Sequence, residues 1–562
     1  MRTSVTIPFL FVLLPVLAWA AAPADLILRG GTIYTLEPDR PVVEALAVRD
    51  GRIMAAGAWA EVAPLAAAAT VVVDLGGLAA YPGFADAHAH VAGLGKSLES
   101  VDLTGCRSEA EALERVRRSV GRTPAGSWIF GRGWDQNRWP TRQFPTHEAL
   151  SLIAPDHPVV LTRVDGHAVW VNRKAMEIAG VGDRPAAVPG GEIILDAAGR
   201  PTGVFVDNAA DLVLRRVPEA TDADIERRLA TAMERCAAAG LTQVHDAGVG
   251  ARELAVYERL RRAGRMPIRI WARLEGPEAW LREPLARGIV RTPDGLLTAR
   301  SVKLYADGAL GSRGAWLLAP YSDRPDTCGL PVNPPEFLER IARLCAERGF
   351  QACTHAIGDR ANREILDVYE KVLAPLPDGK ARRFRVEHAQ VLTDRDIPRF
   401  HALGVVPAMQ PTHCTSDMAW AAERLGPDRS RYAYAWGSLL RDGNHIPMGS
   451  DFPVEEVSPL LGFYAAVTRQ DPKGQPPGGW FPEERMSRED ALRSMTIWAA
   501  EAGFLEDEIG TLRPGKRADL TVCDRDILKV PAAEIPGARV LLTIVGGRVV
   551  HDGRPKDKAL TP

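Results

Sequence analysis

The chain has 562 residues, and its 69 Lys and Arg against 71 Asp and Glu give a formal net charge of −2 at pH 7. This balance excludes the strongly basic surface that binding to nucleic acid or to an anionic membrane would need, so we expect a small-molecule partner. The 7 cysteines include no Cys-x-x-Cys pair and are too sparse for a disulfide scaffold.

A secretory signal peptide is predicted at residues 1–20. Arg2 precedes an apolar run from Val5 to Trp19, and Ala18-Trp-Ala20 forms an Ala-x-Ala cleavage site. An uncleaved membrane anchor is the alternative, but the run is shorter than the roughly 20 residues that a membrane span needs. We therefore expect cleavage after Ala20 and an exported mature chain, periplasmic or extracellular, without membrane attachment.

Short strands are expected near both ends of the chain. Residues 25–29, 45–49 and 52–56 have strand-like patterns, and residues 519–522 and 540–545 have similar ones near the C-terminus. Similar turns, Asp50-Gly-Arg52 and Gly546-Gly-Arg548, lie between strands in the two pieces. We predict that residues 21–80 and 506–562 join into one small β-sandwich.

Between these ends, short apolar runs alternate with segments of helical spacing. Eight runs are strand-like: residues 83–90, 241–247, 268–274, 301–307, 351–357, 383–390, 404–411 and 445–452. Eight strands that alternate with helices predict an α/β fold, a closed (β/α)8 barrel of the TIM type over residues 81–505. In such barrels the chemistry lies where strands end and loops begin.

The segment between the first two runs is too long for one βα crossover, so we predict an insertion over about residues 95–235. Because it follows the catalytic end of the first strand, we expect it to cover the pocket and to select the substrate. Trp134, Arg163 and His167 lie at or beyond the ends of strand-like runs in it and are candidates for substrate contact. Packing within the insertion is the alternative for the tryptophan.

Side chains that bind metals recur at the ends of the barrel runs. His88 and His90 alternate at the end of the first run, so in a strand both imidazoles point to one face, which predicts half of a metal site. For this pair taken alone, a solvated turn or two satisfied core histidines is the alternative. Later runs carry four further candidates for metal binding or acid-base chemistry: Lys303, His355, His388 and Asp451. His413 follows the seventh run and is a candidate for substrate contact, with a surface loop as an equal alternative.

Seven motifs stand in a recognisable order: residues 82–90 (PGFADAHAH), 131–136 (GRGWDQ), 165–168 (DGHA), 302–313 (VKLYADGALGSR), 354–360 (THAIGDR), 386–390 (VEHAQ) and 449–453 (GSDFP). In these motifs the chain resembles the amidohydrolase superfamily, and within it the amidohydrolase family 3 branch that includes N-substituted formamide deformylases. The resemblance covers nearly the whole chain after the leader. It implies a barrel with a sandwich built from both termini.

The resemblance also implies a binuclear metal site, with two zinc ions per chain. One ion would be bound by a carbamate on Lys303 together with His88, His90 and Asp451, and the other by His355 and His388. An unmodified Lys303 in an ion pair with Asp307 is the alternative. Asp451 would also be the catalytic residue, which takes a proton from the metal-activated water and passes it to the departing nitrogen.

We therefore predict a metal-dependent hydrolase that cleaves an amide or N-formyl bond, a C–N bond other than a peptide bond, in a small amide-type substrate. Hydrolysis of a cyclic amide, an ester or a carbamate at the same site is the alternative, because fold and metal site do not fix the substrate. A non-catalytic exported metal-binding protein is the less favoured class. A homodimer is compatible with these features.

Overall fold

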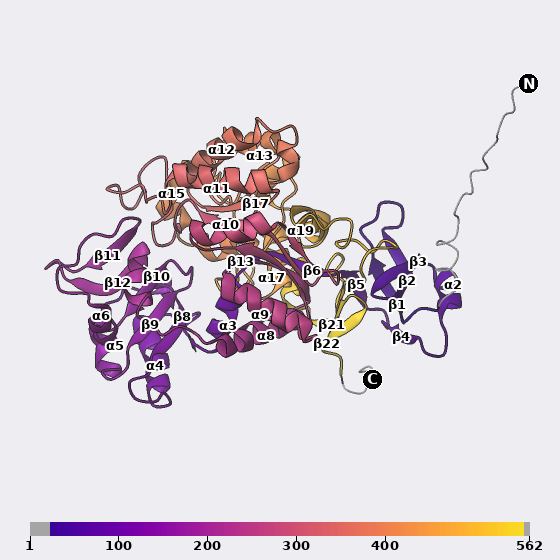
Figure 1. Ribbon diagram of the computed structural model, residues 1–562, viewed down its shortest axis with the longest axis horizontal. Helices are drawn as coiled ribbons and strands as arrows, with labels where there is room; N and C mark the ends of the chain where they lie inside the picture. The colour runs from indigo at the N-terminus through magenta and orange to yellow at the C-terminus, as the bar shows by residue number, and fades with distance from the viewer. Residues whose placement is uncertain (1–22, 556–562) are drawn as a thin grey trace, which may run out of the picture.

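The computed structural model describes residues 23–555, so the predicted signal peptide at residues 1–20 lies outside the described residues. The strands form three sheets, one from both ends of the chain, one central and one from the segment between the first two barrel strands (Figure 1). Within residues 23–555, no helix combines the length and the apolar character that crossing a membrane requires. The seven cysteines, all within this range, form no disulfide.

Both ends of the chain contribute to one eight-stranded sheet of order β22-β21-β20-β5-β1-β2-β3, with β4 paired to β1. The strands are β1 (Leu26–Tyr34), β2 (Val42–Arg49), β3 (Arg52–Gly57), β4 (Val71–Asp74), β5 (Ala79–Pro82), β20 (Leu520–Cys523), β21 (Val540–Val545) and β22 (Arg548–Asp552). The two ends meet at the antiparallel pair β20 and β5, where Leu520 faces Pro82. Apolar side chains from both ends share one buried cluster, so the terminal segments fold as one unit.

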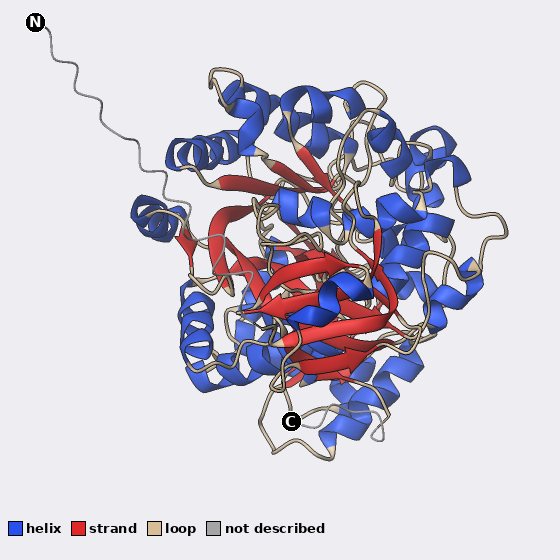
Figure 2. Ribbon diagram, turned by 90° about the vertical axis from the view of Figure 1, so that its right-hand side faces the viewer, coloured by secondary structure: helices blue, strands red, loops and turns tan. Residues whose placement is uncertain are grey.

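The central sheet is a nearly closed barrel of parallel strands. In chain order these are β6 (Phe84–Ala89), β13 (Leu241–Val249), β14 (Arg269–Leu274), β16 (Leu297–Tyr305), β17 (Gln351–Ala356), β18 (Arg385–His388) and β19 (Val406–Ala408), with the short antiparallel β15 (Val290–Arg291) on β16. Every residue of β6, β17 and β18 is buried, the pattern of parallel strands covered on both faces. Figure 2 shows helices around the centrally placed strands.

The eighth barrel strand, predicted at residues 445–452, is not a regular strand in the structure. Its segment joins the barrel through isolated bonds: Gly449 N donates to Met409 O (3.1 Å), and Ala87 N in β6 donates to Met448 O (3.0 Å). Met409 N also donates to Pro447 O (3.2 Å), but Pro447 itself has no N–H with which to extend a ladder. The segment nevertheless bridges β19 and β6 and brings Asp451 to the barrel opening.

The segment between β6 and β13 forms a six-stranded sheet of order β11-β12-β10-β9-β8-β7. Its strands are β7 (Val101–Asp102), β8 (Ile129–Trp134), β9 (Val159–Arg163), β10 (Ala168–Val171), β11 (Gly191–Leu195) and β12 (Pro201–Asp207). Its apolar side chains form two buried clusters of their own. In Figure 1 this sheet lies beside the barrel, at the left.

The helices divide among the same three parts. The terminal part has α2 (Trp59–Val62), and the insertion has α4 (Glu109–Val120), α5 (His147–Ile153), α6 (Arg173–Ala179) and α7 (Asp211–Leu214). Around the barrel lie α3 (Val91–Leu98), α8 (Asp222–Ala238), α9 (Ala251–Arg262), α10 (Glu278–Arg287), α11 (Pro335–Arg348), α12 (Asp359–Leu373), α13 (Ile397–Leu403), α14 (Pro411–Asp417), α15 (Ala421–Ser430), α16 (Trp436–Arg441), α17 (Pro459–Thr468), α18 (Arg488–Ser494) and α19 (Ile497–Ala502). Short 3-10 turns are η1 (Ala63–Leu65), η2 (Gln136–Arg138), η3 (Asn208–Ala210), η4 (Gly379–Arg382), η5 (Pro482–Glu484) and η6 (Ala532–Gly537).

Candidate metal centre

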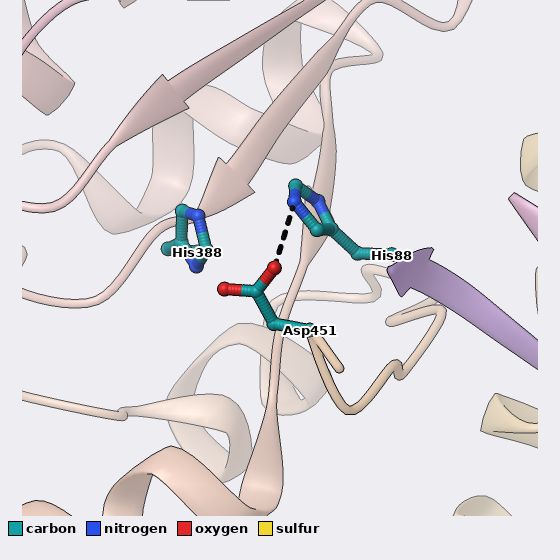
Figure 3. A group of neighbouring side chains, drawn as sticks. All are labelled: His88, His388 and Asp451. Atoms are coloured by element: carbon teal, nitrogen blue, oxygen red, sulfur yellow. Dashed lines mark ion pairs between the residues drawn. The ribbon is translucent and has the colours of Figure 1, made fainter. Parts of the chain in front are cut away.

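Three predicted ligands converge at the carboxyl ends of the barrel strands. One ligand atom each from His88, His388 and Asp451 lies within 4.8 Å of the other two, and all three residues are buried. Asp451 Oδ1 is 3.4 Å from His88 Nε2, and Figure 3 shows these two groups facing each other with His388 opposite. The sequence therefore brings β6, β18 and the segment after Met448 to one point.

His90 approaches the same carboxylate from the start of α3. Its Nε2 lies 3.1 Å from Asp451 Oδ1, and its ring centroid is 5.6 Å from that of His88. His90 follows β6 directly, and its side chain is 31% exposed, whereas that of His88 is fully buried. His88 thus approaches Asp451 from the buried side of the cluster, and His90 approaches it from the exposed side.

Side chains behind the cluster hold the outer nitrogens of two histidines. Glu387 Oε2 lies 2.5 Å from His88 Nδ1, and Gln410 Oε1 lies 2.7 Å from His388 Nδ1. A histidine whose Nδ1–H is bound in this way presents Nε2 as a lone-pair donor, the usual arrangement around a metal. Two buried arginines flank Glu387, with Arg273 Nη1 at 3.1 Å and Arg385 Nε at 2.8 Å.

Lys303 lies inside the barrel beside these ligands. Its Nζ is 3.2 Å from His88 Nε2, and the residue is 3% exposed. Burial lowers the pKa of Lys303 to about 8, although the charge of Glu387 opposes the shift. The alternative ion pair with Asp307 does not form, because the Asp307 carboxylate instead accepts the backbone N–H groups of residues 316, 357 and 358 at 2.8–2.9 Å.

His355 lies next to the cluster but outside the group of three. Its ring centroid is 4.5 Å from that of His388, and its Nε2 lies 3.4 Å from Gly308 O and 3.6 Å from Asp307 Oδ1. Nε2 thus faces the loop after β16, which leaves Nδ1 as the nitrogen for a ligand.

The backbone around the cluster is strained and closely packed. His388 and Asp451 have φ values of 76° and 58°, in the left-handed region that non-glycine residues rarely adopt and that often marks functional sites. Asp86 ties the cluster together, because its carboxylate accepts from His88 N (3.1 Å) and from Ser450 Oγ (2.6 Å). A Cβ on Gly449 would lie 2.5 Å from His88 N, so only glycine fits there.

Two of the predicted substrate contacts reach the cluster. His413 Nε2 lies 3.6 Å from Asp451 Oδ2, and its ring stacks on His388 at 5.7 Å between centroids. His413 is buried in α14, so its alternative, a surface loop, is wrong. His167, in the turn between β9 and β10, has its ring centroid 5.2 Å from that of His355.

The other two lie within the insertion. Trp134 is fully buried and packs against Trp139, Phe144 and Trp170, which matches the packing alternative rather than substrate contact. All three guanidinium nitrogens of Arg163 are engaged, by Gln136 Oε1 (2.8 Å), Asp135 Oδ1 (2.6 Å) and Asp165. The Trp134 ring packs against aromatic neighbours and the Arg163 guanidinium is held by hydrogen bonds and ion pairs, so neither side chain is free for the predicted substrate contact.

Three neighbours of the site were missed in the sequence. Asp86 lies two residues before His88 on the same strand face, so the period of two could have identified it. Gln410 follows β19, a position from which a side chain reaches the barrel opening. Asp207, which contacts His167, ends a strand of the insertion, and no sequence pattern marks it.

The donor set has the character of a site for divalent cations. His413 Nε2 is buried and has no hydrogen-bond partner among residues 23–555, and the buried Asp451 Oδ1 faces the Nε2 atoms of His88 and His90. Burial disfavours the charged form of Asp451, but His88 and His90 hold the pKa of its carboxyl well below its usual value. A buried carboxylate that faces several imidazole nitrogens fits a zinc-like ion.

Comparisons with known proteins agree with this chemistry. The model of the amidohydrolase family matches residues 71–551. Protein LONG AFTER FAR-RED 3 of Arabidopsis thaliana is 34% identical over 551 residues, 95% of this chain and 92% of that protein. N-substituted formamide deformylase of Arthrobacter pascens is 28% identical, over 93% of this chain and 97% of that protein. The crystal structure of an uncharacterized metal-dependent hydrolase from Pyrococcus horikoshii OT3 has a TM-score of 0.74 and 31% identity, covering 90% of this chain and 99% of that chain.

Proposed function

The chain belongs to the amidohydrolase family, and on this premise we propose that it is a metal-dependent hydrolase that cleaves an amide or N-formyl C–N bond in a small molecule. One observation carries the proposal. His88, His388 and Asp451 present ligand atoms within 4.8 Å of one another, while Glu387 and Gln410 hold the outer nitrogens of the two histidines. Buried histidines that are oriented in this way beside a carboxylate support a site for a catalytic metal.

In this proposal the centre would hold two zinc ions, and Lys303, whose Nζ lies 3.2 Å from His88 Nε2, would take part as a carbamate. Arg273 and Arg385 lie buried beneath the cluster, so an ammonium on Lys303 would add a positive charge where a cation must bind. A carbamate replaces that charge with a negative one and supplies two oxygens. His88, His90 and Asp451 would hold one ion together with this group, and His355 and His388 would hold the other.

A bound divalent cation lowers the pKa of a water molecule and polarises a carbonyl group. Side chains of the protein would carry out the proton transfer and the substrate contact. Asp451, ionised between His88 and His90, accepts the proton of the attacking water and delivers it to the departing nitrogen, because an amine must be protonated to leave. His413, whose Nε2 lies 3.6 Å from Asp451 Oδ2, is the side chain proposed to contact the substrate carbonyl.

The proposed substrate class is suggested by the name of a relative and not by the geometry of the site. A relative that is 28% identical over most of both chains is named for deformylation of N-substituted formamides, and N-formyl amines are therefore the first substrates to test. Cyclic amides, esters and carbamates are the alternatives at the same site.

A substrate panel tests the proposal. The full chain is assayed with N-formyl amines, linear amides, cyclic amides, aryl esters and carbamates, before and after removal of metal by a chelator. We expect turnover of an N-formyl or amide compound that is lost on chelation and restored by zinc. Ester turnover without any amide turnover would contradict the proposed bond, and turnover that survives complete metal removal would contradict the proposed chemistry.

Replacing Asp451 tests the proton-transfer role. Asp451→Asn keeps the size of the side chain but removes the base, and loss of a general base typically costs about 10²–10⁴-fold in rate. Asp359→Asn is a matched control, because Asp359 is also buried but lies at the start of α12 and accepts from Leu318 N (2.8 Å). Wild-type turnover by folded Asp451→Asn enzyme would remove Asp451 from this role.

A further inference from the structure

A histidine and an aspartate of the insertion form a pair against the barrel cluster. Asp207 Oδ1 accepts a hydrogen bond from His167 Nδ1 at 2.7 Å, and Asp207 N donates to His167 O at 2.8 Å. The His167 ring lies beside His355, with 5.2 Å between centroids, and its side chain is 20% exposed. The pair therefore reaches the cluster from outside the barrel and is accessible to a small molecule.

Asp207 has features that a merely structural aspartate does not need. Its side chain is 3% exposed, yet Oδ2 has no hydrogen-bond partner among the described residues, whereas buried carboxylates normally satisfy both oxygens. Its backbone has φ 47° and ψ −129°, a conformation that costs on the order of 1–3 kcal/mol for a non-glycine residue. Strain of this kind persists only where the surrounding structure imposes it.

Two glycines make room for this carboxylate. A Cβ on Gly308 would lie 2.7 Å from Asp207 Oδ2, and a Cβ on Gly314 would lie 2.5 Å from it. Both glycines belong to the loop after β16, the strand that carries Lys303. Gly308 O also faces His355 Nε2 at 3.4 Å, so a single loop fixes the position of Asp207 relative to His355.

We propose that Asp207 is a positioning residue that fixes the His167 ring over the barrel cluster, so that the insertion supplies a substrate-contacting histidine to the active site. This inference rests on the proposed function, because it requires a substrate at the cluster. Asp207 occupies Nδ1 of His167, and Nε2 is then the nitrogen presented to the substrate. The insertion thereby contributes a side chain to the active site.

A double-mutant cycle tests the pair. Asp207→Asn, His167→Ala and the double variant are assayed on the best substrate of the panel, together with zinc content and thermal unfolding of each purified protein. We expect Asp207→Asn to lower kcat/KM by about 10–100-fold, as loss of an orienting partner typically does, with unchanged zinc content. The double variant should match His167→Ala within about 2-fold, because Asp207 acts only through His167.

Asp211→Asn is the matched control, since Asp211 is an exposed aspartate in α7, close to Asp207 in sequence. Its kinetics and unfolding should equal those of the wild type. Multiplicative losses in the double variant would overturn the proposal, and so would a loss in Asp207→Asn that follows loss of zinc or of folded protein.

A spectroscopic readout keeps the inference separate from the activity. In the full chain labelled with ¹⁵N-histidine, the His167 signal, identified by its loss in His167→Ala, should show a protonated, hydrogen-bonded Nδ1. An unprotonated Nδ1 would overturn the proposal even if Asp207→Asn failed to fold. If the wild-type enzyme hydrolysed no compound of the panel, the proposed function would fail while this spectrum still reported the pairing.

Discussion

Glu387 lies beneath the histidine cluster and connects it to two buried arginines. Its Oε2 lies 2.5 Å from His88 Nδ1 and 3.1 Å from Arg273 Nη1, and its Oε1 lies 2.8 Å from Arg385 Nε. The side chains of Glu387, Arg273 and Arg385 are 0% exposed. Glu387→Gln keeps the shape of the side chain but leaves two guanidinium groups without their carboxylate.

Two effects of different kind follow from this change. Breaking a buried ion pair by removing one partner typically costs about 3–5 kcal/mol, so the free energy of unfolding should fall by about that amount. In addition, His88 loses the carboxylate that would orient its Nε2 toward the proposed metal, and loss of such a partner typically weakens metal binding about 10–100-fold. A purely structural role of Glu387 would explain the loss of stability but would not explain weaker metal binding.

Asp519→Asn separates the two effects. Asp519, the residue before β20, forms a buried ion pair with Arg269 in β14, with Arg269 Nε 2.6 Å from Asp519 Oδ2 and both side chains 4% exposed. Urea unfolding of the metal-free proteins should give similar losses for Asp519→Asn and Glu387→Gln, because bound metal would otherwise add to stability. Zinc affinity, measured by competition with a chelator, should fall only for Glu387→Gln. Equal zinc affinity of Glu387→Gln and wild type would refute the assigned role of Glu387.

Three further predictions concern packing, pH and processing. Gly449→Ala places a Cβ 2.5 Å from His88 N, so it should lower the free energy of unfolding by about 1–3 kcal/mol and cause loss of zinc. Gly462→Ala in α17 is the control, because its Cβ would meet only Met448 at 3.8 Å, and its midpoint of thermal unfolding should equal or exceed that of the wild type. Equal midpoints for Gly449→Ala and the wild type would refute the close approach. Burial raises the pKa of Asp417 to about 7, so between pH 4 and 7 the folded state holds a proton that the unfolded chain has already released. The free energy of unfolding of the wild type should therefore fall, relative to that of Asp417→Asn, as pH rises from 4 to 7. Urea unfolding at pH 5 and pH 7 checks the sign, and a wild-type stability that rises relative to the variant would contradict it. Mass spectrometry of the secreted protein should find a chain that begins at Ala21, and an intact Met1 would contradict cleavage.

The sequence was most informative where a strand period sets the direction of a side chain. Alternation at the end of β6 placed His88 and His90 on one side, and both lie within 3.4 Å of Asp451 Oδ1. The order of the strand-like runs also matched the order of the parallel strands, because neighbouring strands in a barrel are consecutive in the chain. The family assignment from the seven motifs is confirmed by the family model over residues 71–551.

Contacts between distant segments could not be predicted in the same way. Trp134 and Arg163 stand after strand-like runs as active-site residues often do, but their neighbours within the insertion bury the ring and neutralise the guanidinium. The apolar residues of the segment at 445–452 predict a strand, but its pairing with the segment after β19 is limited to one isolated bridge, between Met409 and Met448. Asp207 depends on a backbone conformation that only the folded insertion imposes.

The metal content of the purified mature chain tests the central claim most directly. Elemental mass spectrometry of wild-type protein, and of Asp451→Asn prepared in parallel, measures metal per chain alongside hydrolysis of the best substrate. We predict close to two zinc ions per wild-type chain and a hydrolytic rate that rises in proportion to the zinc content. A fully active wild-type protein that holds no metal after growth with added zinc would contradict the account.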